Sequence, residues 1–217
     1  EIFLNSDLVS SIEIYHSDLY TIPFIKKTNN NKNSMSHPVL FVNGDVEKKL
    51  FFSQLYFYSD SLLKIYFNNS LISKVIKKFP NLIKNYFGGM RLFLDPSISS
   101  KIVLTKNNGV ITKKIIEHDH TTQKKFKRAF LRKFRGRGIF SLNIFGSLIN
   151  NGESYHFGSQ FKQNNKNTET SSDSIGRVGN LKKTFVIDSS VLPVVNTGPI
   201  TYTVMANSLR ISKEFIK

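Results

Sequence analysis

Hydrophobic and polar positions alternate along several stretches of the chain, which is the period-two pattern of half-buried strands. In residues 11–26 the alternation predicts two strands separated by a turn at Ser17–Asp18. Asn43-Gly44 predicts a hairpin turn between two apolar runs, and Asn107–Gly109 predicts another turn. Further strands are predicted over residues 50–58, 90–94, 101–105 and 110–116.

Other stretches have apolar residues at helical spacing. Residues 60–86 predict two helices separated at Pro80, with Gly88-Gly89 after them. In the basic segment 121–138, Phe126, Phe130 and Phe134 lie four residues apart and share one helix face. Strands joined by hairpin turns, together with paired helices, predict an α+β fold with a mostly antiparallel sheet and flanking helices.

The chain is strongly basic, with 31 Lys and Arg against 15 Asp and Glu and a net charge of +16. Such a charge favours an anionic partner. The chain is also rich in Lys, Asn, Ile and Phe, a bias that AT-rich coding DNA produces without selection for binding. Segment 121–138 therefore reads first as a surface helix docked by its Phe side chains, and second as a helix that binds nucleic acid or a membrane.

Several classes of chemistry lack their motifs. Without cysteine there is no disulfide or thiolate chemistry, and the compartment stays open. No apolar run approaches the roughly 18 residues of a membrane helix. The segment "GRGIFS" at 136–141 has Ser141 where a dinucleotide fingerprint needs its third glycine. His118 and His120 flank Asp119 but supply too few ligands, so we expect no metal site.

His156 is the one candidate for acid–base chemistry in the chain. It follows the turn-like Asn150–Gly152 and precedes Gly158-Ser159, small residues that permit close approach. Histidine is the side chain best suited to exchange protons at neutral pH. A lone histidine is weak evidence for a catalytic site. A later stretch of the chain strengthens the case for His156.

That stretch is "FVIDSSVLPVVNTGPITYTVMANSLRI" at 185–211. The apolar residues 185–187 predict a strand, and Asp188-Ser189-Ser190 predict a tight bend after it. Gly198 and Pro199 then predict the start of a helix, with Pro at the first helical position. A helix start carries free N–H groups and partial positive charge, so the segment predicts a ligand-facing strand–loop–helix.

Residues 153–211 resemble the C-terminal end of the glucose–methanol–choline (GMC) flavoprotein oxidoreductases. The resemblance is carried by Tyr155-His156, by Gly176-Arg177, by "FVIDSSVLP" at 185–193 and by "TVMAN" at 203–207. Residues 1–150 resemble the substrate domain of that family more loosely, with "LFLDPSISSKIVL" at 92–104 as the best local match.

The resemblance implies an FAD-dependent enzyme that oxidises an alcohol or sugar-like donor. His156 would take the hydroxyl proton while hydride passes to the flavin. Asp188 and Ser189 would lie against the ribityl–pyrophosphate part of FAD, and the helix start at Pro199, Ile200 and Thr201 would face the flavin ring. The partner is then a small-molecule substrate rather than nucleic acid, and the electron acceptor is not identified.

The chain departs from the family in two respects. The family has a second His or Asn before the last helix, and Pro199 stands at that position here, so Asn196 is the candidate replacement. The N-terminal G-x-G-x-x-G is absent. The resemblance thus predicts a fragment, with residues 1–150 as substrate-domain-like α+β and 151–217 as the strand–loop–helix that completes an FAD-binding α/β domain. Two alternatives stay open: an inactive relative, and a basic module that binds nucleic acid or a membrane surface.

Overall fold

The structure is a computed structural model with an α+β fold whose sheets are mostly antiparallel. It describes residues 11–26, 40–46, 48–57, 78, 86–141, 146–149, 154–164, 168–179, 181 and 183–216. The chain divides into two compact units. Unit 1 comprises residues 1–18, 95–118 and 150–217, and unit 2 comprises residues 19–94 and 119–149.

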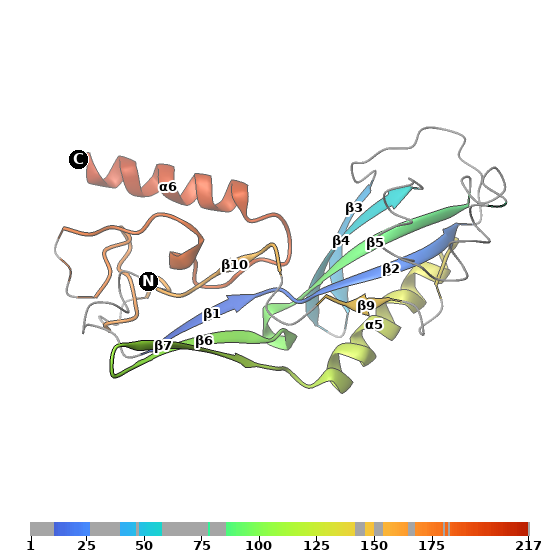
Figure 1. The fold of residues 1–217 in the computed structure, drawn as a ribbon. Coiled ribbons are helices and arrows are strands. Elements are labelled where there is room, and N and C mark those ends of the chain that lie inside the picture. The colour runs from blue at the N-terminus through green and yellow to red at the C-terminus, as the bar shows by residue number, and fades with distance from the viewer. Residues whose placement is uncertain are drawn as a thin grey trace. The chain divides into compact units, whose positions relative to one another are not determined.

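Unit 2 is built on a six-stranded sheet in the order β3-β4-β5-β2-β8, with β9 also paired to β2 (Figure 1). All of these pairings are antiparallel. The strands are β2 (Leu19–Lys26), β3 (Leu40–Val46), β4 (Lys49–Phe57), β5 (Phe87–Leu94), β8 (Ile139–Phe140) and β9 (Ser147–Leu148). The predictions of strands at 50–58 and 90–94 are confirmed, whereas Gly88 and Gly89 lie inside β5 instead of ending a helix.

The basic segment forms α5 (His120–Arg135), which lies along one face of this sheet (Figure 1). Phe126, Phe130 and Phe134 are all buried, and the Phe130 ring packs against Phe51 of β4 with 4.9 Å between ring centroids. Burying three aromatic side chains supplies most of the docking free energy of such a helix. The prediction of a helix docked by its Phe side chains is confirmed.

The predicted turn at Asn43-Gly44 is wrong, because both residues lie within β3. Asn43 pairs with Phe52 and Gly44 with Phe51, and the chain reverses only between Val46 and Lys49. Lys48 adopts a positive φ of 61° there. A Cβ at Gly44 would stand 3.2 Å from the Phe51 ring, so this glycine serves close strand packing rather than a turn.

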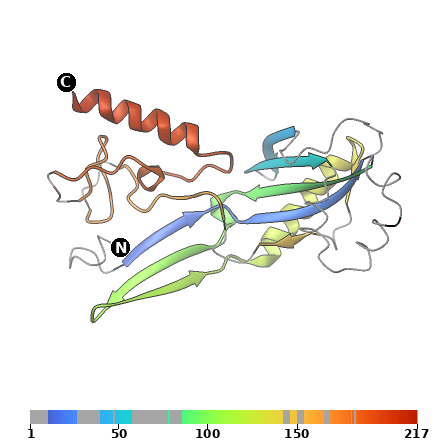
Figure 2. The ribbon, with the colours of Figure 1, turned by 45° about the horizontal axis from the view of Figure 1, so that its top comes forward.

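Unit 1 contains a four-stranded antiparallel sheet in the order β10-β1-β6-β7 (Figure 2). Its strands are β1 (Ser11–His16), β6 (Lys101–Asn107), β7 (Val110–Ile116) and β10 (Phe157–Gly158). Asn108 and Gly109 have φ values of 49° and 80°, as the two central residues of a type I′ hairpin turn require. The two strands predicted around Ser17–Asp18 are confirmed, but they join different sheets instead of pairing with each other.

The rest of unit 1 is mostly irregular chain with two 3₁₀ turns, η1 (Pro96–Ile98) and η2 (Ser189–Val191), and the C-terminal helix α6 (Thr201–Phe215). A small apolar core joins the sheet to this chain. Its buried members are Ile12, Phe161, Val178 and Val191, with Ile14, Leu104 and Val186 packed against them.

The predicted strand at 185–187 is wrong. Phe185 makes a single bridge to Arg177, and Val186 donates its N–H to the carbonyl of Gly176 over 2.8 Å. Ile187 is 45% exposed. An apolar run becomes a regular strand only beside a partner strand, and among the described residues this run meets a glycine turn instead.

The predicted helix start is displaced. Thr201 is the first residue of α6, so Pro199 precedes the helix by two positions instead of occupying its first. Ile211 is the buried residue of α6, and Phe215 contacts Phe185 edge to face at 5.0 Å. Ser208 donates to the carbonyl of Ile187 over 2.7 Å, so α6 rests on the irregular chain before it.

The predicted loop at 26–38 and the two predicted helices at 60–86 fall almost wholly outside the described residues. Within the described residues, no helix has both the length and the apolar character needed to cross a membrane.

Candidate functional site

His156 lies immediately before β10 and is 8% exposed. Its imidazole hydrogen-bonds to the backbone of Thr197, in the loop that leads into α6. Unit 1 therefore brings together a histidine and a loop forty residues apart in the sequence. The contact places the ring near the start of the C-terminal helix.

Burial governs the charge of this histidine. Loss of hydration disfavours the imidazolium and lowers the pKa of His156 below its ordinary value, while the hydrogen bond to Thr197 acts in the opposite direction. The ordinary pKa of histidine is about 6.5, so a lowered pKa keeps the ring neutral at pH 7. A neutral imidazole that donates through one nitrogen has a lone pair on the other and is a competent base.

The segment after His156 runs beside η2. Ser159 donates its N–H to the carbonyl of Ser189 over 3.0 Å, and Phe161 donates to that of Ser190 over 2.8 Å. A Cβ on Gly158 would stand 2.5 Å from the Ser189 carbonyl oxygen, so only glycine fits there. The structure thus places the predicted cofactor-binding pair Asp188–Ser189 alongside the segment that carries His156.

The side chain of Asp188 is engaged locally. Its carboxylate accepts the N–H of Ser190 over 2.9 Å and also the Ser190 hydroxyl, which makes Asp188 the N-cap of η2. Asp188 is exposed and Ser189 half-buried. The aspartate therefore shapes the turn, and a ligand at this position would meet the backbone of the turn.

The start of α6 has no side-chain cap. Ile200 is its N-cap residue and makes no side-chain hydrogen bond there. Pro199 is exposed, and Thr201 is the exposed first helical residue. The first N–H groups of the helix are left without a capping side chain, which suits an acceptor from outside the chain.

Asn196, the predicted second catalytic residue, is exposed, and its amide nitrogen lies 3.3 Å from the Thr203 hydroxyl in the first turn of α6. The residue that meets His156 is its neighbour Thr197, itself buried. Sequence reasoning missed Thr197 because the contact is made by its backbone, which any residue type supplies.

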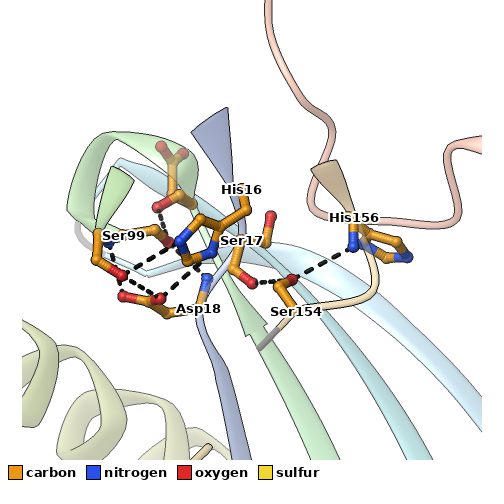
Figure 3. A network of polar contacts seen from close by, with 8 residues as sticks. His16, Ser17, Asp18, Ser99, Ser154 and His156 are labelled. Carbon is orange, nitrogen blue, oxygen red and sulfur yellow. Dashed lines mark hydrogen bonds and ion pairs between the residues drawn. The ribbon is translucent and has the colours of Figure 1, made fainter. Parts of the chain in front are cut away.

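Sequence reasoning also missed a second buried polar cluster in unit 1, formed by His16, Asp18, Ser99 and Ser100. Figure 3 shows His16, Asp18 and Ser99 of this cluster. The carboxylate of Asp18 accepts the N–H and the hydroxyl of Ser100, each over 2.8 Å. His16 Nδ1 lies 3.4 Å from the same carboxylate. The signal in the sequence is the polar "HSD" between two apolar strands, a pattern that by itself predicts only a turn.

The pair His118 and His120 has a structural explanation. Asp119, between them, is the N-cap of α5 and accepts the N–H groups of Thr121 and Thr122 over 2.9 and 3.2 Å. These bonds lower the pKa of Asp119 to about 2. Over the described part of the chain, no three His, Asp or Glu side chains gather as metal ligands.

Neither the comparison with protein-family models nor the comparison with curated proteins finds a match for this chain.

Proposed function

We propose that the chain is the C-terminal part of an FAD-dependent oxidoreductase that acts on the CH–OH group of an alcohol or sugar-like donor. The observation that carries the proposal is the placement of His156: its buried, uncharged imidazole reaches the loop before an uncapped helix start. The resemblance of residues 153–211 to the GMC flavoproteins supports the same assignment.

In this proposal His156 is the general base. Its imidazole accepts the hydroxyl proton of the donor while the hydride leaves the adjacent carbon, so that an alcohol becomes a carbonyl compound. Burial supports this role because it holds the ring in its neutral, proton-accepting form. The hydrogen bond to the backbone of Thr197 fixes the orientation of the ring.

In this proposal two segments of the described chain would contact a flavin. FAD, when bound, would supply the hydride acceptor. The N-terminal turn of α6, at Pro199, Ile200 and Thr201, would face the flavin ring and offer N–H groups to developing negative charge. The turn at Asp188–Ser189, held next to the His156 segment, would contact the rest of the cofactor through its backbone. Asn196 is proposed as the second polar group near the donor hydroxyl.

The proposal is tested on protein produced from the complete reading frame. We expect it to co-purify with FAD, identified by chromatography after heat release, and the bound flavin to be bleached anaerobically by an alcohol from a panel of glucose, methanol and choline. Protein that contains no flavin and takes up none when FAD is added would refute the proposal.

A second candidate function is favoured by the solvent side of α5. The helix contains no acidic residue, and its exposed cations are Lys124, Lys125, Arg128, Arg132, Lys133 and Arg135. Such a face suits the phosphates of nucleic acid, whose binding would weaken steeply with salt. Retention on a DNA column at low salt, lost on charge reversal of Arg128 and Arg132, would support this candidate, and no retention would remove it.

A further inference from the structure

The backbone of His156 is held from the side of β1. Its N–H donates to the Ser154 hydroxyl over 3.3 Å, and that hydroxyl donates to the carbonyl of Ser17 over 2.5 Å (Figure 3). Ser17 in turn donates its own N–H to the carbonyl of His156 over 3.4 Å. The peptide groups on both sides of His156 are therefore tied to the bend that follows β1.

That bend is itself fixed by buried polar groups. Asp18 receives two hydrogen bonds from Ser100, and its own N–H donates to the Ser99 hydroxyl over 2.9 Å. Asp18 is 3% exposed and His16 is 1% exposed. A buried carboxylate is costly unless its bonds are satisfied, so this cluster tolerates little movement.

The cluster also touches the His156 segment through a ring contact. The imidazole of His16 packs against the ring of Phe157, with 5.5 Å between centroids and a tilt of 47°. Because Phe157 directly follows His156, the cluster restrains the chain on the C-terminal side of the histidine as well. The backbone of His156 is thus held by hydrogen bonds to the bend after β1, and its imidazole is held by the hydrogen bond to Thr197.

We infer that Ser154, backed by the buried Asp18 cluster, is a positioning residue that holds the His156 imidazole in its buried place against Thr197. The inference rests on the proposed function only in its statement of why His156 is positioned, namely to act as a base. The contacts themselves involve no flavin and no substrate.

A different interpretation of the cluster is excluded by its burial. Ser100, His16 and Asp18 have the residue types of an acyl-transfer triad, and Ser100 Oγ lies 3.3 Å from His16 Nε2. The three side chains are at most 3% exposed, and the Ser100 hydroxyl donates to Asp18. A substrate carbonyl has no route to that hydroxyl, so the cluster supports its neighbours instead of attacking a substrate.

The experiment is an NMR titration of the His156 imidazole in the complete protein with isotope-labelled histidine, its signal assigned with His156→Gln. Ser154→Ala removes the tie between His156 and Ser17. We expect the imidazole to gain access to water and its pKa to rise toward about 6.5. Ser154→Thr keeps the hydroxyl and is expected to restore the wild-type pKa.

Ser171→Ala is the matched control, because Ser171 is also buried in unit 1 and its hydroxyl hydrogen-bonds to the backbone of Thr168. We expect it to leave the His156 titration unchanged. Asp18→Asn, a second variant with little change in volume, is expected to raise the same pKa. An unchanged His156 titration in Ser154→Ala, with native chemical shifts elsewhere, would overturn the inference.

This readout separates the inference from the proposed function. A shifted titration in protein that binds no flavin would leave the positioning role standing and remove the oxidoreductase assignment. An unchanged His156 titration in protein whose flavin is reduced by alcohol would remove the positioning role and leave the oxidoreductase assignment standing.

Discussion

Gly158 lies so close to Ser189 that a Cβ on the glycine would stand 2.5 Å from the serine carbonyl oxygen and 3.2 Å from its Cβ. The N–H of the next residue, Ser159, donates to that same carbonyl. This contact, together with the bond from the Phe161 N–H to the Ser190 carbonyl, joins the segment that carries His156 to the turn at Asp188–Ser189. The two halves of the candidate site depend on it.

Gly158→Ala is therefore expected to separate β10 from η2 and to destabilise unit 1, because backbone cannot give way as a flexible side chain can. Urea unfolding monitored by circular dichroism measures the effect. Gly136→Ala is the control: its φ of −61° suits alanine, and the nearest atom to a new Cβ is 3.8 Å away. Equal stability of the two variants would show that the contact at Ser189 is unimportant.

In unit 2, Phe130→Ala is expected to lower the free energy of unfolding by about 3–5 kcal/mol, the usual cost of emptying a buried aromatic site. Phe130 is fully buried between Phe51 and Phe134. Phe140→Ala provides the comparison, since Phe140 is 47% exposed, and a much smaller loss is expected. A loss below about 1 kcal/mol for Phe130→Ala would contradict the docking of α5 described above.

Stability is expected to fall as the pH drops below about 6.5. Burial lowers the pKa of both His16 and His156 in the folded chain, opposed at His16 by Asp18. The unfolded chain therefore binds protons at these positions at a higher pH than the folded chain does. The loss begins near the unfolded pKa and continues down to the lowered folded values.

Urea midpoints measured between pH 7.5 and 5 test this expectation, with His16→Gln as a variant that removes one of the two groups. The window lies above the ordinary carboxyl pKa values of about 3.9 and 4.3. A flat profile in wild type, or the same slope in His16→Gln, would speak against the assigned role of His16.

Asn196→Ala is expected to slow turnover with alcohol, but by less than loss of His156, because Asn196 is exposed and already contacts Thr203. Steady-state kinetics on the flavin-loaded complete protein measures the effect, and the exposed Asn164→Ala serves as a comparison. Unchanged kinetics in Asn196→Ala would leave His156 as the sole polar catalytic group.

The sequence predicted those parts of the fold in which local pattern and packing agree. The three Phe side chains of α5 and the Asn108-Gly109 turn are such cases, since the residues that define the element also make its contacts. The turn predicted at Asn43-Gly44 is wrong because glycine suits two situations. It is common in turns, and it also fits where a strand passes close to an aromatic ring, as Gly44 does at Phe51.

The candidate site was predictable only in part. His156 and the turn at Asp188–Ser189 were identified by residue type, and unit 1 does bring their segments together. Thr197 could not be predicted, because its contact with His156 is made by its backbone, which every residue type has. The partners of Asp18 could not be predicted either. Ser99 and Ser100 lie some eighty residues away in the sequence, and no local pattern encodes so distant a pairing.

The central claim is that His156 is the base of a flavin-dependent alcohol oxidation. The most direct measurement is the rate of anaerobic flavin reduction by the best alcohol of the panel, in stopped flow, for wild type, His156→Ala and the control His120→Ala in α5. We predict that His156→Ala retains FAD yet is reduced roughly 10²-fold or more slowly, and that His120→Ala matches wild type. Flavin reduction at the wild-type rate in His156→Ala would contradict the account.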